Sequence, residues 1–316
     1  MRIVIVGPGA LGSLLATRLA HCLEERGTDE GDAHDLQLLD YREERAAILR
    51  EKGLLLEEEG RSSRCRVRVE TDPETCAGCD VLFLCVKSTG VEGAVARLSP
   101  FLSPATLLIA MQNGIAHLDV VRSLPCTGAV AVTSEGANMV APGHVRHGGK
   151  GVTRIGIVDR SRQGDEARLP AMSRLLNEAG LETIIVDDPL KYVWEKLFVN
   201  VGVNALTAIY RCPNGELLRS QETLELMTAA VNEAVAVARA LDIPVEGDPV
   251  RRTIEVCEST AKNLSSMYQD VHNRRRTEID AINGAVVALG GKAGIPTPVN
   301  SDLVRRVKEI EETFSS

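Results

Sequence analysis

Three polar side chains recur at four-residue intervals in an apolar stretch of the chain: Lys196, Asn200 and Asn204. In a helix this interval stacks all three on one face, each one turn above the last. The residues between them are mostly apolar, so we expect little water around that face. An ammonium and two amides are costly to desolvate unless they bind something. The spacing therefore favours a site for a polar ligand, and the alternative is a polar stripe that faces solvent.

The composition is that of a globular protein, with 44% hydrophobic and 25% charged residues. A chain of 316 residues exceeds one ordinary core, so we expect two domains. The formal net charge of -8 argues against nucleic acid and anionic membrane surfaces as partners. Aromatic residues make up only 3%, which leaves few platforms for stacking on single-stranded nucleic acid. A small anionic molecule can still bind at a local cationic position.

No apolar run approaches the length of a membrane span, and the apolar segment 1–7 is too short for a signal peptide. We therefore expect a cytoplasmic protein, as a monomer or a homodimer, with no membrane partner. The eight cysteines are scattered, which fits reduced thiols better than a disulfide framework. Cys76 and Cys79 form a single CxxC without a second pair or a nearby histidine, so no metal site is expected.

The first half of the chain alternates continuous apolar runs with helical stretches. Such runs are typical of strands covered on both faces. The alternation predicts a mostly parallel sheet with right-handed crossovers. The polar residues 28–35 are expected to form a solvated loop. The expected strands are 2–6, 36–39, 81–86, 106–110, a segment around Val145, 152–158 and 183–186, and the expected helices are 10–25 and 42–52.

The pattern becomes helical nearly throughout after residue 188, with prolines between the helical segments. We therefore expect a domain boundary near this point. The fold class is α/β: a Rossmann-type doubly wound domain over residues 1–188, followed by an all-α domain over 189–316. The expected helices of the second domain include 223–241, 250–263, 277–289 and 301–312.

A glycine-rich turn directly follows the first expected strand and opens a helix. Its residues are Gly7, Pro8, Gly9, Ala10, Leu11 and Gly12. In this GxGxxG arrangement the first glycine permits a tight turn, the second lets a pyrophosphate approach, and the third lets helix and strand pack closely. The helix N-terminus offers N–H groups and a positive dipole end to the phosphates. The turn therefore predicts a dinucleotide site, and the alternative is a glycine-rich turn without a ligand.

The end of the second expected strand contacts the adenosine ribose in folds of this kind. Asp40 could accept hydrogen bonds from a ribose 2′-OH, which favours NAD. Arg42 could pair with a 2′-phosphate, which favours NADP. The residues alone leave both cofactors open.

Polar residues also follow two other expected strands, Lys87 after 81–86 and Asn113 after 106–110. The carboxyl edge of an open α/β sheet lines the ligand crevice, and the glycine turn lies at the same edge. We therefore expect a crevice for cofactor and substrate, against the alternative of solvated strand ends. Three candidates in the second half have an equally good structural interpretation: Asn214 as a turn residue, Ser266 as a helix cap, and Glu278 as a carboxylate that follows a basic run.

Taken together, these segments resemble the 2-dehydropantoate (ketopantoate) 2-reductase family over almost the whole chain. The resemblance rests on the GxGxxG start and on six further motifs, of which the last four are highly specific in their order and spacing. These motifs are VKS at 86–88, QNG at 112–114, WEKLFVNVGVNALTA at 194–208, CPNGEL at 212–217, SSMYQD at 265–270 and TEIDAING at 277–284.

The resemblance implies reduction of 2-dehydropantoate to pantoate, a step toward pantothenate and coenzyme A. By motif match Lys196 would be the proton donor, with Glu278 as a second catalytic residue. The 2-keto acid substrate would be held by Asn113, Asn200, Asn204, Asn214 and Ser266. Besides the glycine turn, Asp40 and Arg42, the cofactor would contact Lys87, Asn113, Ala137 and Glu278.

The family uses NADPH, with an arginine at the end of the second strand. Here Asp40 precedes Arg42, which stands one residue late, so the sequence departs from the family pattern at this point. The family habit makes NADPH the expected cofactor, and Asp40 makes NADH the alternative. Two other functions stay open. One is a related 2-hydroxy- or β-hydroxy-acid dehydrogenase with another substrate, and the other is a nucleotide-sensing regulator that has lost catalysis.

The implied chemistry suits the residues. Hydride arriving at a ketone carbon leaves negative charge on its oxygen, and a nearby ammonium can stabilise that charge and deliver a proton. Desolvation would lower the pKa of Lys196 and make it a better acid at neutral pH, whereas a nearby Glu278 would oppose that shift.

Overall fold

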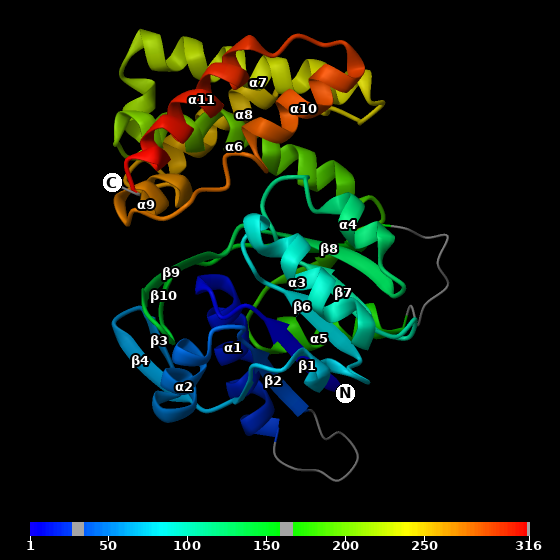
Figure 1. Cartoon of the computed structure of the whole chain (residues 1–316). Helices are drawn as coiled ribbons and strands as arrows, with labels where there is room; N and C mark the ends of the chain where they lie inside the picture. Colours follow the sequence, from blue (N-terminus) through cyan, green and yellow to red (C-terminus); the bar gives the residue numbers. More distant parts are fainter. Residues whose placement is uncertain (27–34, 159–166, 315–316) are drawn as a thin grey trace. The chain divides into compact units, whose positions relative to one another are not determined.

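The computed structural model describes residues 1–26, 35–158 and 167–314, which form two compact units (Figure 1). The first, which we call the sheet unit, comprises Met1–Gln112 and His117–Pro189. The second, the helical unit, comprises Asn113–Ala116 and Leu190–Ser316. The sequence pattern does not predict that Asn113–Ala116 packs with the helices.

An eight-stranded sheet forms the centre of the sheet unit, in the order β12-β11-β8-β7-β6-β1-β2-β5. All neighbouring strands are parallel except β8 and β11, which are antiparallel. The strands are β1 (Arg2–Val6), β2 (Asp35–Leu39), β5 (Arg68–Glu70), β6 (Val81–Leu84), β7 (Leu107–Ala110), β8 (Thr127–Thr133), β11 (Thr153–Ile157) and β12 (Thr183–Ile185). The expected doubly wound α/β fold is confirmed.

Helices cover both faces of this sheet. Ile3 and Ile5 of β1 share one core cluster with residues of α1 and α5, whereas the intervening Val4 and Val6 point to the opposite face. Both faces are buried, which explains why the central strands are apolar without alternation. The helices are α1 (Ala10–Arg26), α2 (Glu43–Lys52), α3 (Val91–Leu98), α4 (Leu118–Ser123) and α5 (Arg168–Glu178), with short 3-10 turns η1 (Pro73–Cys76), η2 (Ser88–Gly90) and η3 (Ser99–Phe101).

A second, four-stranded sheet packs on α1, in the order β4-β3-β10-β9. Its strands are β3 (Leu54–Glu58), β4 (Arg61–Cys65), β9 (Gly136–Ala141) and β10 (His144–Gly149). The sequence pattern predicts only the strand around Val145, which is fully buried in β10. The other three strands were missed, and β4 shows why: its first four residues are polar and exposed, so it lacks an apolar alternation.

The helical unit contains six α-helices and one 3-10 helix among the described residues. They are α6 (Pro189–Tyr210), η4 (Asn214–Leu218), α7 (Gln221–Ala240), α8 (Pro249–Ser259), α9 (Ser266–His272), α10 (Asn283–Ala293) and α11 (Pro298–Glu312). The long helix α6 is central and largely buried. A Cβ at Gly202 would lie 2.8 Å from Val231 and 3.0 Å from Thr253, so this glycine lets α7 and α8 pack closely on α6.

The structure corrects two expectations from the sequence. The expected helix 277–289 begins only at Asn283, so Glu278 lies in a turn and not on a helix. This turn is fixed because the backbone N–H and the hydroxyl of Thr277 both donate to Glu311, at 2.7 and 2.6 Å. Of the expected loop 28–35, Asp35 already belongs to β2, and the rest lies outside the described residues.

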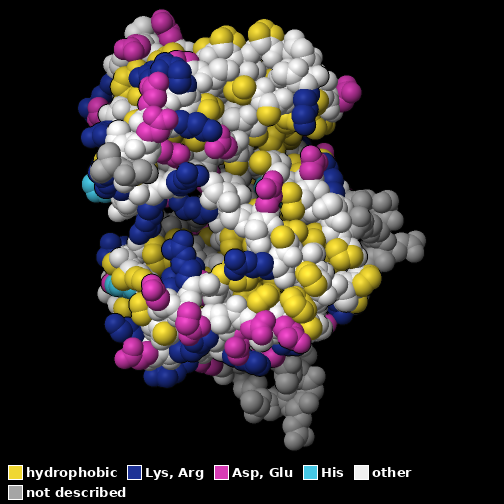
Figure 2. Space-filling view, viewed as in Figure 1, with side chains coloured by type: hydrophobic (Ala, Val, Ile, Leu, Met, Phe, Trp, Pro, Cys, Tyr) yellow, Lys and Arg dark blue, Asp and Glu magenta, His cyan; other side chains and the backbone are white. Residues whose placement is uncertain are grey.

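Basic, acidic and hydrophobic side chains are all present on the face drawn in Figure 2. The large hydrophobic side chains that stand exposed are Val140, Ile184, Ile185 and Leu264. Within the described residues, no helix has the length and apolarity needed to span a membrane.

Candidate active site

The glycine turn connects β1 to α1 in the geometry that a phosphate-binding turn requires. Gly7 has φ +92°, and its N–H donates to the Leu39 carbonyl of β2 at 3.0 Å. A Cβ at Gly12 would lie 2.3 Å from the Gly7 carbonyl oxygen, closer than any side chain tolerates. Both glycines are therefore required for the turn to pass from strand to helix at this distance.

The end of β6 lies against this turn, and the end of β7 is bound to the end of β6. A Cβ at Gly7 would lie 2.8 Å from Val86, so the exposed Lys87 follows directly on a residue that contacts the turn. The amide of Gln112 donates to the Leu84 and Val86 carbonyls at 2.7 and 2.9 Å. Its buried Oε1 has no hydrogen-bond partner among the described residues, which leaves an acceptor available at this edge.

Ala137, the expected nicotinamide neighbour, lies in β9. It packs with Ala10 of the glycine turn around a small apolar cluster of Leu14, Leu56 and Val145. The small sheet therefore forms a wall beside the turn. This brings Ala137 to the same region of the sheet unit as the glycines.

Asp40, at the end of β2, is only 2% exposed and has its carboxylate fully engaged. Arg45 of α2 binds both of its oxygens, with Nη2 2.7 Å from Oδ1, and the Arg42 backbone N–H donates to Oδ1 at 3.1 Å. The Arg42 side chain stands exposed at the residue that precedes α2. The sequence analysis missed Arg45, although an arginine five residues after a strand-end aspartate is visible in the sequence.

In the helical unit, α6 presents Lys196, Asn200 and Asn204 on one face, as their spacing predicts. Asn204 is buried, while Lys196 and Asn200 are half-buried. Burial lowers the pKa of the Lys196 ammonium to about 8, and the Glu278 carboxylate opposes that shift. Desolvation is the larger effect, so the lowered pKa makes the lysine a better proton donor near neutral pH.

Asn113 lies beside the same glutamate. Its side-chain amide donates to Glu278 Oε2 at 3.0 Å. The approach is close because Gly114 has φ +77° and because a Cβ there would lie 2.0 Å from the Ala281 carbonyl oxygen. The helical unit therefore brings Lys196, Glu278 and Asn113 together, although they are far apart in the chain.

Two further candidates lie near the other end of the polar row. Thr207 of α6 shares a 2.7 Å hydrogen bond with Ser265, whose hydroxyl caps α9 by accepting from the Tyr268 N–H. Because Ser265 is the cap, the neighbouring Ser266 keeps an exposed hydroxyl. The buried Asn214 donates to the Thr260 hydroxyl at 2.9 Å, and its Oδ1 has no partner among the described residues.

A buried network that the sequence analysis missed holds this arrangement in place. Asn283, which begins α10, donates to the Val201 carbonyl of α6 at 3.1 Å and to Asn300 at 3.0 Å. Asn300 donates in turn to Glu233 of α7 at 2.7 Å. Fully buried amides of this kind fix the positions of four helices. In the sequence, Asn283 stands within TEIDAING, so the motif itself was the available signal.

The cysteines of the CxxC segment are free thiols, and burial raises the pKa of Cys76 to about 12. Within the residues that the structure describes, no group of three or more His, Cys, Asp and Glu side chains could hold a metal ion.

The chain is similar to known proteins over both of its units. The family model described as ketopantoate reductase PanE/ApbA matches residues 3–160, and its C-terminal counterpart matches residues 188–311. The 2-dehydropantoate 2-reductase of Halobacterium salinarum is 36% identical over 311 residues, covering 96% of this chain and 98% of that protein. The chain belongs to the ketopantoate reductase family.

Other members of the ketopantoate reductase family agree with this assignment. The 2-dehydropantoate 2-reductase of Vibrio cholerae is 33% identical over 318 residues, covering 100% of this chain and 99% of that protein. A solved PanE/ApbA family ketopantoate reductase from Ralstonia eutropha has a TM-score of 0.88 and 30% identity, with both chains fully covered. A ternary structure of D-mandelate dehydrogenase with NADH and anilino(oxo)acetate has a TM-score of 0.86 and 26% identity, also with full coverage of both chains.

Proposed function

We propose that this protein reduces 2-dehydropantoate to (R)-pantoate with hydride from NADPH, as a step of pantothenate and coenzyme A biosynthesis. The observation that carries the proposal is the cluster of Lys196, Glu278 and Asn113, in which burial lowers the pKa of the lysine to about 8. A nucleotide sensor would have no need for such a proton donor. The relatives named 2-dehydropantoate 2-reductase support the substrate.

A nicotinamide dinucleotide fits the residues of the sheet unit. The pyrophosphate would lie on the turn from Gly7 to Gly12, where a side chain would fill the space, and the α1 N-terminus would stabilise its charge. Lys87 and Ala137 of the same unit would hold the rest of the cofactor. When bound, the reduced nicotinamide supplies hydride to the ketone carbon.

The residues of the helical unit perform the other half of the reaction. The Lys196 ammonium stabilises the negative charge that develops on the ketone oxygen and donates its proton there. Glu278 lies close enough to influence the lysine, and its bond to Asn113 fixes its orientation. Asn200, Asn204, Asn214 and Ser266 orient the carboxylate and hydroxyl of the substrate without adding a second fixed cation.

The turnover rate should depend on the protonation of Lys196. A general acid works only in its protonated form, so the reduction is expected to proceed fully below about pH 8 and to slow as the pH rises through that pKa. The measurement is kcat/KM for 2-dehydropantoate reduction from mildly acidic to strongly alkaline pH. A profile that stays flat well above the pKa, with chemistry limiting the rate, would exclude Lys196 as the acid.

The contacts of Asp40 favour NADPH over NADH. A carboxylate that binds a ribose must accept hydrogen bonds from its hydroxyls, whereas the two Asp40 oxygens already accept three hydrogen bonds from Arg45 and from the Arg42 backbone, which leaves little of their capacity. Arg45 also neutralises the charge that would repel a 2′-phosphate. The exposed Arg42 side chain remains to pair with that phosphate.

Arg42→Ala is therefore expected to weaken NADPH binding by roughly ten- to a hundredfold and to leave NADH binding nearly unchanged, because one charge-assisted hydrogen bond is lost. Fluorescence titration with each cofactor measures the two dissociation constants. Lys52→Ala, which removes one exposed charge at the other end of α2, is the matched control. If Arg42→Ala weakens the binding of both cofactors equally, or if the wild-type protein does not bind NADPH, then the protein does not recognise the 2′-phosphate of the ribose.

The activity itself is tested with purified protein, 2-dehydropantoate and each reduced cofactor. We expect oxidation of NADPH that depends on the substrate, with pantoate identified by mass spectrometry as the product in equal amount. Cofactor binding without any turnover would instead favour a nucleotide-sensing protein.

A further inference from the structure

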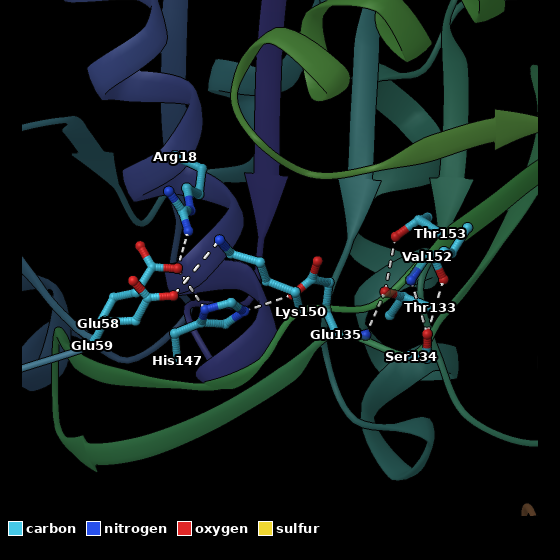
Figure 3. Close-up of polar contacts among 10 residues, drawn as sticks. All are labelled: Arg18, Glu58, Glu59, Thr133, Ser134, Glu135, His147, Lys150, Val152 and Thr153. Carbon is cyan, nitrogen blue, oxygen red and sulfur yellow. Dashed lines mark hydrogen bonds and ion pairs between the residues drawn. The ribbon is translucent and has the colours of Figure 1, made fainter.

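A histidine of the small sheet lies between two carboxylates inside the sheet unit (Figure 3). His147 Nδ1 is 2.7 Å from Glu58 Oε1, and Nε2 is 2.7 Å from Glu135 Oε2. The side chains of His147 and Glu135 are only 5% and 3% exposed. Arg18 of α1 binds the same Glu58 oxygen. This buried cluster connects β3, β10, the segment before β9, and α1.

The hydrogen-bonding capacity of the ring decides what this cluster can do. A neutral imidazole has one N–H and donates to one carboxylate only, whereas the positively charged ring donates to both. With the charged ring, His147 and Arg18 balance Glu58 and Glu135. Charge-assisted hydrogen bonds are the strongest that side chains form, and they are less screened in a buried place. The positions of the two ring nitrogens therefore allow His147 to bind Glu58 and Glu135 at the same time.

Glu135 belongs to a segment that is fixed from its other side as well. The Ser134 N–H donates to the Val152 carbonyl at 3.1 Å, and the Val152 N–H donates to the Ser134 hydroxyl at 2.9 Å (Figure 3). The Glu135 N–H donates to the Thr133 hydroxyl at 3.1 Å. Residues 134–136 thus have Val152, the residue before β11, on one side and His147 on the other.

The same segment continues into the wall beside the glycine turn. His147 lies directly opposite Ala137 in the β9–β10 pair, and the pairing register shifts just after it, between His147 and Gly149. Such irregularities redirect a side chain next to functional sites. Ala137 and Ala10 of the glycine turn pack against the same cluster of Leu14, Leu56 and Val145, and Glu135 lines a small cavity together with Leu11 of that turn.

We infer that His147, held between Glu58 and Glu135, is a positioning residue that keeps residues 135–137 against the glycine turn and so shapes the cofactor site. The inference rests on the proposed function, because it requires that this turn binds a nicotinamide dinucleotide. His147 acts through Glu135 and the backbone of β9, without touching the cofactor.

The test compares NADPH dissociation constants of the full-length variants, measured by fluorescence titration well below their melting temperatures. His147→Gln is expected to weaken binding about tenfold, the size of one lost charge-assisted hydrogen bond. Glu135→Gln keeps the shape and one acceptor oxygen, so a smaller loss is expected, and it serves if His147→Gln does not fold. His144→Gln is the matched control: His144 is on the same strand, with Nε2 2.8 Å from Glu57 Oε1, and its loss should leave NADPH binding unchanged.

The possible outcomes distinguish a failure of the inference about His147 from a failure of the proposed function. A merely structural role would lower the melting temperature of His147→Gln while its NADPH dissociation constant stays within about twofold of wild type, and that result would overturn the inference. If His144→Gln weakens NADPH as much as His147→Gln does, the effect belongs to the whole strand and the inference also fails. A wild-type protein that binds neither NADPH nor NADH would refute the proposed function, and the inference with it.

Discussion

Lys196→Ala is expected to cut the turnover of 2-dehydropantoate by roughly a hundred- to a thousandfold, about 2.7–4 kcal/mol of transition-state stabilisation. The ammonium interacts with charge that develops only during reduction, so its loss should lower kcat far more than it raises the cofactor dissociation constant. The position of Lys196 supports a large effect, because burial has already lowered its pKa to about 8. Steady-state kinetics with saturating cofactor measures the change.

Lys191→Ala is the matched control on the same helix. Lys191 forms an ion pair with Glu246, with 2.6 Å between Nζ and Oε2. Lys191→Ala therefore removes a positive charge from α6 but leaves Lys196, Asn200 and Asn204 unchanged. Turnover of this control should stay near that of wild type. Near-normal turnover of Lys196→Ala, when chemistry limits the rate, would show that another group delivers the proton.

Gly12→Ala is expected to weaken NADPH binding at least about a hundredfold and to destabilise the sheet unit by about 1–3 kcal/mol, the usual cost of overpacking. The new Cβ would lie 2.3 Å from the Gly7 carbonyl oxygen and 3.1 Å from the Cys85 Cβ. Both neighbours are fixed, since one is backbone and the other belongs to a chain segment beside the turn. The helix must therefore move away from the turn, and its N-terminal N–H groups move with it.

Thermal unfolding and cofactor titration measure the two effects of Gly12→Ala. Gly291→Ala in α10 makes the same chemical change where no atom lies within 4 Å of the new Cβ. That control should keep normal NADPH affinity and gain a little stability, since alanine favours a helix over glycine. Unchanged NADPH affinity in Gly12→Ala would mean that the cofactor does not lie on this turn.

The features predicted correctly from the sequence are local. The glycine turn follows from its spacing between one strand and one helix, and the row on α6 follows from the four-residue interval. Neither needs any knowledge of distant contacts. The parallel sheet was also predictable, because apolar runs buried on both faces are conspicuous in a sequence.

The features that were missed depend on contacts between distant segments. Glu278 was expected on a helix because the pattern is helical over 277–289, but the contact of Thr277 with Glu311 holds this segment as a turn. The small sheet depends on pairing β3 with β10, about ninety residues later. The neutralisation of Asp40 by Arg45 is the exception, because these two residues are only five apart; it requires the chain to turn from β2 into α2, which a linear motif does not describe.

The most direct test of the proposed function compares two substrate and cofactor pairs. The fold resembles that of a D-mandelate dehydrogenase solved with NADH. Phenylglyoxylate, the 2-keto acid that corresponds to mandelate, is therefore the most informative substrate for comparison. We expect kcat/KM for 2-dehydropantoate with NADPH to exceed that for phenylglyoxylate with NADH by roughly a hundredfold or more, since the polar site residues would pair with the substrate hydroxyl. A preference for phenylglyoxylate with NADH would contradict the proposal and identify a dehydrogenase of another 2-hydroxy acid.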